Sequence, residues 1–182
     1  FIKKLFLDEL ISRSRENDDG TRPYGIGDDV YEFINNNPDY IIGLVENDNF
    51  NINDMIGHET TLLNLIVISN NTDLFKYMLS HGADPEIKDY ANYNTLCSIL
   101  ESYNKNMLSV LYHHCDVEGL NDLFYNIIMN NYQEVKNIIN TDINYMKKYN
   151  ESYYNPLIYY FQVGNSDMKM IKLLCSSDID IN

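Results

Sequence analysis

Residues 61–84 read TLLNLIVISNNTDLFKYMLSHGAD, and this stretch decides the fold. Leu63, Ile66 and Val67 follow the i, i+3, i+4 spacing that places apolar side chains on one face of a helix. A polar break and a second apolar run, LFKYML, follow. Gly82 stands where the second helix must end, in a left-handed conformation that suits glycine. The stretch therefore predicts a helix, a short loop, a second helix and an extended finger.

The same pattern recurs along the chain at a near-constant period. Each first helix begins its apolar face at Val30, Leu63, Leu96, Phe124 or Leu157, with two more apolar residues at +3 and +4. The intervals between these starts are 33, 33, 28 and 33 residues. Similar short motifs stand at the ends of four segments: FNIN at 50–53, GADPE at 82–86, TDIN at 141–144 and IDIN at 179–182. Such a period is typical of stacked repeats, so we predict an all-α solenoid of about five helix-loop-helix units sharing one apolar seam.

The expected organisation is an N-terminal cap followed by a repeat array. Residues 1–15 place an apolar stripe opposite charged residues, which predicts an amphipathic capping helix over the edge of the first repeat. Docking of this helix on a partner is the alternative. A polar, Gly-rich loop completes the cap, residues 1–27. The array then covers 28–182, divided at about 28–53, 54–89, 90–118, 119–149 and 150–182.

Short local signals predict where individual helices begin and end. Pro38 suits the first turn of the second helix of the first unit. Thr60 or Thr61 can cap the first helix of the second unit, because their hydroxyl oxygens accept from free backbone N–H groups. Cys115 occupies the position of Gly82 in the third unit, so we expect a distorted helix end there.

Composition indicates an ordered and acidic protein. Hydrophobic residues make up 45% of the 182 residues, which is enough to build a core. The net charge is −14, from 27 acidic and 13 basic residues. Neutralising phosphates requires clustered Lys and Arg, so we expect neither nucleic acid nor an anionic membrane as a partner. A basic protein surface fits this charge better. The alternative is that the acidic charge only keeps the protein soluble.

Cysteine usage and hydropathy indicate a reducing, aqueous compartment. Cys97, Cys115 and Cys175 are odd in number and widely spaced, which is not the pattern of a disulfide framework. No apolar stretch approaches the roughly 18–20 residues that a membrane span needs. No signal peptide is visible in a chain that opens at Phe1. We therefore expect a cytoplasmic protein.

One cluster, His113-His114-Cys115, could suggest a metal ligand or a nucleophile. A structural zinc site needs about four ligands in two closely spaced pairs, and the sequence has no second pair. A catalytic cysteine needs an activating histidine within reach, and neighbours in sequence on a helix do not face each other. We expect no catalytic residue, no cofactor and no metal site, and not an enzyme.

The second unit resembles the ankyrin repeat, a helix-loop-helix-finger unit of about 33 residues. The family pattern at the first helix is Thr-Pro-Leu-His-x-Ala. Thr61 and Leu63 match it, whereas Leu62, Asn64 and Ile66 stand in place of Pro, His and Ala. The fifth unit restores the Pro-Leu pair as PL at 156–157. The resemblance covers about residues 28–182 and implies a module that recognises other proteins.

The departures from that pattern resemble the divergent ankyrin proteins of poxviruses. Large Ile, Phe and Tyr replace Ala, and Asn and Tyr are abundant, with 16 Tyr and no Trp. Members of that family are intracellular host-range and immune-evasion factors, and many carry a C-terminal F-box-like segment that joins cullin-based ubiquitin ligases. We find no such segment in these 182 residues. An AT-rich genome of another parasite or a protist is the alternative source of the Asn-Ile-Tyr bias.

The poxvirus resemblance implies a host protein as the partner, bound in the host cell cytoplasm. Such a partner would be sequestered, or recruited to a ubiquitin-ligase adaptor through a segment not present here. The alternative function is a structural scaffold or oligomerisation array of a non-viral intracellular protein.

Partner binding is expected on the concave face of the array, formed by the fingers and the exposed ends of the first helices. Tyr and Met are enriched at protein interfaces. For each single tyrosine, packing of one finger on the next is the alternative. Mapping by repeat position assigns to this face His58, Ile68, Tyr90, Tyr93, Glu101, Met129, Tyr153, Tyr154 and Gln162.

Overall fold

A computed structural model describes residues 28–46, 50–56, 60–141 and 156–176 of the chain. The expected capping helix at 1–15, the loop that follows it and the finger at 179–182 lie outside these residues. The chain divides into two compact units, Phe1–Ser102 and Tyr103–Asn182, each of which is described by itself. The third expected repeat, 90–118, has its first helix in one unit and its second helix in the other.

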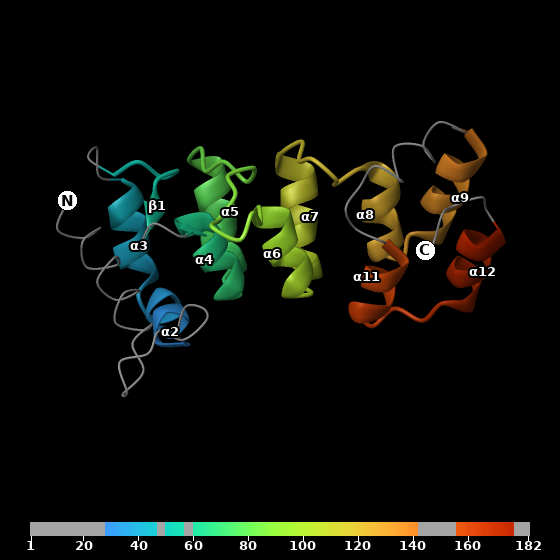
Figure 1. Cartoon of the computed structure of the whole chain (residues 1–182), viewed down its shortest axis with the longest axis horizontal. Coiled ribbons are helices and arrows are strands. Elements are labelled where there is room, and N and C mark those ends of the chain that lie inside the picture. Colours follow the sequence, from blue (N-terminus) through green and yellow to red (C-terminus); the bar gives the residue numbers. More distant parts are fainter. Residues whose placement is uncertain (1–27, 47–49, 57–59, 142–155, 177–182) are drawn as a thin grey trace. The chain divides into compact units, whose positions relative to one another are not determined.

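The first unit consists of helix pairs and one small hairpin (Figure 1). Its two strands pair in antiparallel fashion, with Met55 opposite Thr61 and Ile56 opposite Thr60, and they form the finger before the second repeat. The fold is otherwise helical, as predicted. The elements are α2 (Asp28–Asn36), α3 (Pro38–Val45), β1 (Met55–Ile56), β2 (Thr60–Thr61), α4 (Leu62–Ile68), α5 (Thr72–Ser80) and α6 (Thr95–Glu101).

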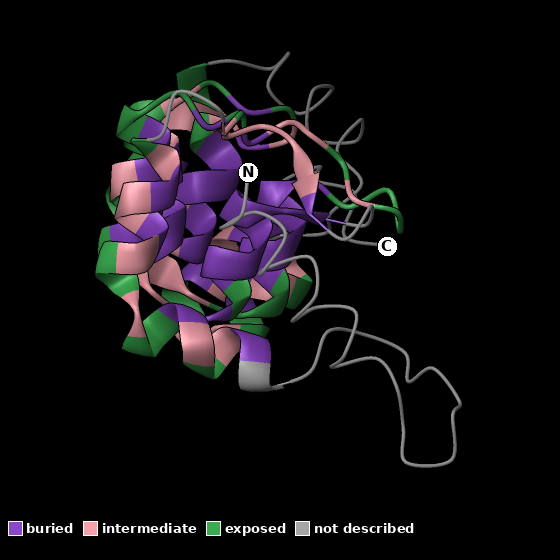
Figure 2. Cartoon of the chain, turned by 90° about the vertical axis from the view of Figure 1, so that its left-hand side faces the viewer, coloured by how far each residue is buried: buried purple, intermediate pink, exposed green. Residues whose placement is uncertain are grey.

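Helix α4 lies at the centre of the first unit. It packs against α2, α5 and α6, and every side chain from Leu62 to Val67 is buried. Figure 2 shows the contrast between the buried side of the helices and their exposed side. A helix covered on several sides must be apolar around most of its circumference, which explains the run LLNLIVI.

Asparagine and threonine side chains fix the helix starts in the first unit. Thr61 Oγ1 accepts a hydrogen bond from Asn64 N at 3.2 Å. Asn71 and Asn94 use their Oδ1 atoms in the same way, at 3.0 and 3.1 Å from the backbone nitrogens three residues later. Helix α3 begins at Pro38, as predicted. These caps satisfy backbone donors that have no partner inside the helix.

Two asparagines connect successive repeats of the first unit. The Asn53 side chain accepts from Asp84 N at 2.8 Å and donates to Gly82 O at 3.2 Å. Asn64, which replaces the histidine of the ankyrin pattern, is fully buried and accepts from the Thr95 hydroxyl at 2.8 Å. Its Nδ2 has no hydrogen-bond partner. A buried polar contact has low tolerance for misalignment, so this bond favours one register of α4 against α6.

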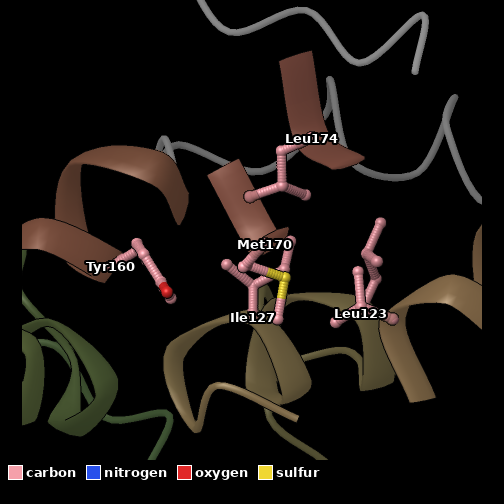
Figure 3. Close-up of a cluster of buried hydrophobic side chains, with 6 residues drawn as sticks. Leu123, Ile127, Tyr160, Met170 and Leu174 are labelled. Atoms are coloured by element: carbon pink, nitrogen blue, oxygen red, sulfur yellow. The ribbon is translucent and has the colours of Figure 1, made fainter. Parts of the chain in front are cut away.

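The second unit also consists of helix pairs (Figure 1). Helix α8 packs against α7, α9 and α11, and α12 packs against α9. The core contains Leu123, Ile127, Val135, Tyr160, Met170 and Leu174 (Figure 3). The elements are α7 (Lys105–His114), α8 (Asp122–Ile128), α9 (Tyr132–Thr141), α11 (Pro156–Gln162) and α12 (Met168–Ser176).

The end of α7 confirms the expectation for Cys115. This residue follows the helix in an extended conformation, with φ −141° and ψ 147°. Gly82, at the equivalent position after α5, has φ 87° instead. A side chain makes the left-handed conformation unfavourable, so the chain leaves α7 without the glycine-type turn.

The second residue after the first helix identifies equivalent positions in the second to fifth repeats. Asn70, Tyr103, Asn130 and Gly164 all have positive φ, between 54° and 81°. In three of these repeats the same hydrogen bond closes the helix end, from the left-handed residue to the carbonyl three residues earlier. It joins Asn70 N to Val67 O at 2.9 Å, Asn130 N to Ile127 O at 3.0 Å and Gly164 N to Phe161 O at 3.0 Å.

This alignment corrects the predicted start of the fourth repeat. Leu63, Leu96, Leu123 and Leu157 each lie seven residues before the left-handed residue, so the equivalent start is Leu123 and not Phe124. The intervals become 33, 27 and 34 residues. The prediction was wrong because both residues are buried and apolar, and the polar Asn126 interrupts the correct i, i+3, i+4 series.

The predicted continuous apolar face is interrupted at one position of the fifth repeat. Phe161, expected on the buried face of the fifth first helix, is 48% exposed. Leu157 is only half-buried, whereas Tyr160 between them is fully buried. Helical spacing places the three side chains near one face, but burial also requires a neighbour on that face.

Candidate protein-binding surface

The loop 89–93 between α5 and α6 is held by its own backbone and by one carboxylate. Asp89 N donates to Tyr93 O, and Asn92 N donates to Asp89 O, both at 2.9 Å. Asp89 Oδ1 accepts from Ala91 N and from Tyr93 N, again at 2.9 Å. Asn92 takes a left-handed conformation with φ 67°, which asparagine tolerates better than most residues. The loop is therefore a closed turn.

Further hydrogen bonds attach this segment to the start of α6. Thr95 N donates to Pro85 O at 3.1 Å. Asn94 Nδ2 donates to Glu86 Oε2, also at 3.1 Å, while its Oδ1 caps the helix. Asn94 and Thr95 are buried, so these bonds are shielded from water. The base of the loop is consequently fixed to the helical core of the first unit.

The loop presents two tyrosines to solvent. Tyr90 is 65% exposed and Tyr93 is 44% exposed. A tyrosine offers a large contact area with few rotatable bonds, so its immobilisation in a complex loses little entropy. Because the backbone beneath them is already ordered, binding through these rings requires little further ordering.

Ile68 and Glu101 lie where the sequence placed them, at the exposed ends of first helices. Each is the last residue of its helix, α4 or α6, and each precedes the left-handed residue by two positions. Ile68 is 44% exposed, and Glu101 is also exposed. An isoleucine at this exposure is available for contact with another molecule.

The second unit holds two more of the predicted residues, and one of them requires a correction. Gln162 is exposed and is equivalent to Ile68 and Glu101. Met129 is one residue later than that position, caps the C-terminus of α8 and is half-buried. The equivalent residue is Ile128, which is buried. The one-residue error in the fourth repeat thus carried over into the predicted site.

Three of the predicted residues lie outside the part of the chain that the structure describes: His58, Tyr153 and Tyr154. The surface is therefore best defined in the first unit, by loop 89–93 and by the helix ends at Ile68 and Glu101.

The first unit is strongly acidic around this surface. Lys76 and Lys88 are the only lysines or arginines between residues 28 and 102, whereas Asp84, Glu86 and Asp89 precede or belong to the loop. On the side of α5, the Tyr77 hydroxyl donates to Glu46 Oε1 at 3.4 Å. Burial raises the pKa of Tyr77, and the Glu46 carboxylate raises it further. The whole unit offers a field that attracts cations.

Metal-binding side chains do not gather at one point in the described part of the chain. Among those residues, no three His, Cys, Asp or Glu side chains gather closely enough to hold a metal ion. His113 and His114 are exposed at the end of α7, and the Cys115 thiol beside them is half-buried. None of the described helices has the length and apolar character to cross a membrane.

Sequence reasoning missed the role of Asp89. The signal was present in the stretch DYANY, since Asp and Asn both favour turns through side chain to backbone hydrogen bonds. The sequence pattern singled out Tyr90 and Tyr93 in this stretch. It did not single out Asp89, whose carboxylate orders the backbone beneath the two rings.

Comparison with known proteins bears on this same region. Residues 58–90 match the family model described as Ankyrin repeat. No curated protein and no solved structure matched the chain. The matched residues include α4 and α5, and they end at Tyr90 in the exposed loop. This match supports an ankyrin-repeat protein. Ankyrin repeats are typically non-catalytic modules of protein–protein interaction.

Proposed function

We propose that the chain recognises another protein through the tyrosine-bearing surface of its first unit, made of loop 89–93, Ile68 and Glu101. The observation that carries this proposal is the exposure of Tyr90 and Tyr93 on a loop whose backbone is already closed by hydrogen bonds. Exposed aromatic rings on a fixed backbone are typical of residues that dominate binding energy at interfaces.

The charge of the unit indicates the chemistry of the partner. Asp84, Glu86 and Asp89 precede or belong to the loop that bears the two rings, and Lys76 and Lys88 are the only lysines or arginines between residues 28 and 102. An arginine or lysine of the partner would meet a carboxylate and could lie over a tyrosine face, where the ring attracts a cation. The partner surface is therefore a basic one, and opposite charge would also speed its encounter with this unit.

The finer part of the proposal concerns the biological setting. The resemblance of the sequence to divergent poxvirus ankyrin proteins supports a host protein as the partner and a host-range or immune-evasion role. Under this proposal the chain sequesters the host protein in the cytoplasm, or recruits it to a ubiquitin ligase through a segment outside these residues. Affinity capture from host-cell extract, read by mass spectrometry, supplies the partner for the quantitative test.

That test compares the wild-type chain with the double variant Tyr90→Ala/Tyr93→Ala. Two interface tyrosines at about 2 kcal/mol each, about 4 kcal/mol together, predict a loss of affinity of roughly 1,000-fold, measured by titration calorimetry with the purified partner. Circular dichroism and the unfolding midpoint report whether the fold is retained. Met168→Ala is the control, since Met168 is 59% exposed but lies in the second unit. Unchanged affinity in a folded double variant rejects the proposal.

A further inference from the structure

Asp89 binds both backbone polar groups of Tyr93. The Asp89 N–H donates to Tyr93 O, and Asp89 Oδ1 accepts from Tyr93 N, both at 2.9 Å. The same Oδ1 accepts from Ala91 N, and the Asp89 carbonyl accepts from Asn92 N, again at 2.9 Å. One residue therefore fixes the backbone from which the Tyr93 ring projects.

The segment that follows Tyr93 is fixed as well. Asn94 is buried and caps α6 through its Oδ1, which lies 3.1 Å from Cys97 N. Thr95 N donates to Pro85 O, also at 3.1 Å. Tyr93 thus lies between a half-buried carboxylate and the first turn of a helix that packs against α4. A change in its backbone position would break hydrogen bonds on both sides.

Tyr90 differs from Tyr93 in this respect. In the described part of the chain, no hydrogen bond involves Tyr90, through either its backbone or its hydroxyl. Its ring is 65% exposed, against 44% for Tyr93. The Tyr90 ring offers more area, but the Tyr93 ring is attached to the more constrained backbone. Both properties count, since the contact energy gained on binding is offset by the entropy lost in ordering the groups that bind.

Building on the function proposed above, we propose that Asp89 is a positioning residue for Tyr93, and that Tyr93 rather than the more exposed Tyr90 dominates partner recognition. The Asp89 carboxylate acts through the backbone that it orders, because its Oδ1 already accepts from two N–H groups. A ring that is ordered before the partner arrives contributes more of its contact energy to affinity, because less entropy is lost on binding.

The free chain gives a first test that needs no partner. In Asp89→Ala, amide exchange measured by NMR should become severalfold faster at Ala91 and Tyr93, because both N–H groups lose their acceptor. Asp89→Asn should restore the slow exchange, since the asparagine oxygen can also accept two hydrogen bonds. The amide of Phe75, which donates to Asn71 O outside the loop, is the internal control and should not change.

A peptide probe gives the affinity test. Peptides are selected on the wild-type chain from a random library displayed on phage, and those that also bind Tyr90→Ala/Tyr93→Ala are removed. Calorimetry with a retained peptide should show a loss of affinity of about 100-fold for Tyr93→Ala and about tenfold for Tyr90→Ala. Together these losses account for the roughly 1,000-fold loss expected of the double variant.

A double-mutant cycle tests whether Asp89 acts through Tyr93. Asp89→Ala should weaken peptide binding about tenfold in the wild-type chain and less than about twofold in Tyr93→Ala, because that variant has no ring to position. The cycle is measured at about 0.5 M NaCl, where the lost charge of Asp89 is largely screened. Asp89→Asn should stay within about threefold of wild type at that salt concentration, since it keeps the acceptor oxygen.

The outcomes separate the two proposals. If the selection yields no peptide that depends on the two tyrosines, the proposed function is rejected, and the positioning role with it. If such a peptide is found, the positioning role alone is rejected when Tyr90→Ala costs as much as Tyr93→Ala or more. It is also rejected when the effects of Asp89→Ala and Tyr93→Ala simply multiply, when Asp89→Asn fails to rescue binding, or when exchange at Ala91 is unchanged. Circular dichroism verifies that each variant is folded, and the comparison of the two tyrosine variants stands even if Asp89→Ala unfolds.

Discussion

Tyr160 shows how a single residue connects two repeats of the second unit. Its hydroxyl donates to Asn130 Oδ1 at 2.9 Å and accepts from Asp167 N at 3.0 Å. Asn130 follows α8, the first helix of the fourth repeat, by two residues, and Asp167 precedes α12 in the fifth repeat. The ring itself is fully buried in the apolar core. One side chain thus supplies packing and orients two helix ends at once.

Replacing Tyr160 with Phe should remove these two hydrogen bonds while keeping the ring. We expect the free energy of unfolding to fall by about 1–3 kcal/mol, because Asn130 Oδ1 and Asp167 N lose their partner in a partly buried place. Urea unfolding at neutral pH measures the change. Tyr103→Phe, which alters an exposed tyrosine of the same unit, should change it by less than about 0.5 kcal/mol. Equal effects would contradict a specific role of the Tyr160 hydroxyl.

Alkaline titration gives a second readout of the same residue. Burial raises the pKa of Tyr160 above its ordinary value of 10.0. Above pH 10 the unfolded chain therefore releases this proton first, so the contribution of Tyr160 to stability, complete below pH 10, is lost as the pH rises through the folded pKa. The stability difference between wild type and Tyr160→Phe should shrink from pH 9 to pH 11 by measured urea unfolding. A constant difference would show that the hydroxyl does not sense the core.

Left-handed residues recur after the helices of this fold. After α5, Gly82 has φ 87°, and its N–H and that of Ala83 bond back to Leu79 O and Met78 O at 3.2 and 3.1 Å. These bonds satisfy carbonyl groups that would otherwise have no partner at the helix end. The turn also delivers the Gly82 carbonyl to the side chain of Asn53 in the preceding finger.

The substitution Gly82→Ala should lower the free energy of unfolding by about 1 kcal/mol through backbone strain. Steric crowding is not the cause, since an added Cβ would meet nothing within 4 Å. Gly82→Asn should cost less than Gly82→Ala, because asparagine tolerates the left-handed region better. Chemical unfolding of the three proteins measures both differences. An alanine variant as stable as wild type would mean that this turn relaxes without loss.

At the scale of the whole molecule, charge is unevenly distributed along the chain. Residues 1–102 carry 18 acidic and 7 basic residues, a net charge of −11, whereas residues 103–182 carry 9 acidic and 6 basic residues, a net charge of −3. This distribution concentrates the attraction for a basic partner in the first unit.

Salt should therefore stabilise the free chain and weaken its complex with a basic partner. Screening of repulsion among the acidic groups should raise the thermal midpoint by a few degrees between 0.05 and 0.5 M NaCl. The same range should lower the affinity for the partner, because the attraction between opposite charges is screened as well. Thermal melts and calorimetry measure the two trends, with KCl as a control for ion identity. A midpoint that falls with added salt would contradict the expected self-repulsion.

The sequence by itself determined the repeating helix pairs and most of their ends. Apolar spacing within a helix and the identities of Pro38, Thr61 and Gly82 are local signals, and local signals act through dihedral angles and neighbouring hydrogen bonds. The sequence also determined the acidic charge, and it directed attention to Tyr90 and Tyr93, which are exposed as expected.

Only the tertiary structure decided the features that depend on a neighbouring helix. The register of the fourth repeat was open because Leu123 and Phe124 are both apolar, and the left-handed Asn130 together with its helix-end bond selected Leu123. The exposure of Phe161 could not be foreseen because its apolar spacing is the same as in the buried repeats. Spacing determines which side chains share a helix face, but burial depends on whether another helix lies against that face.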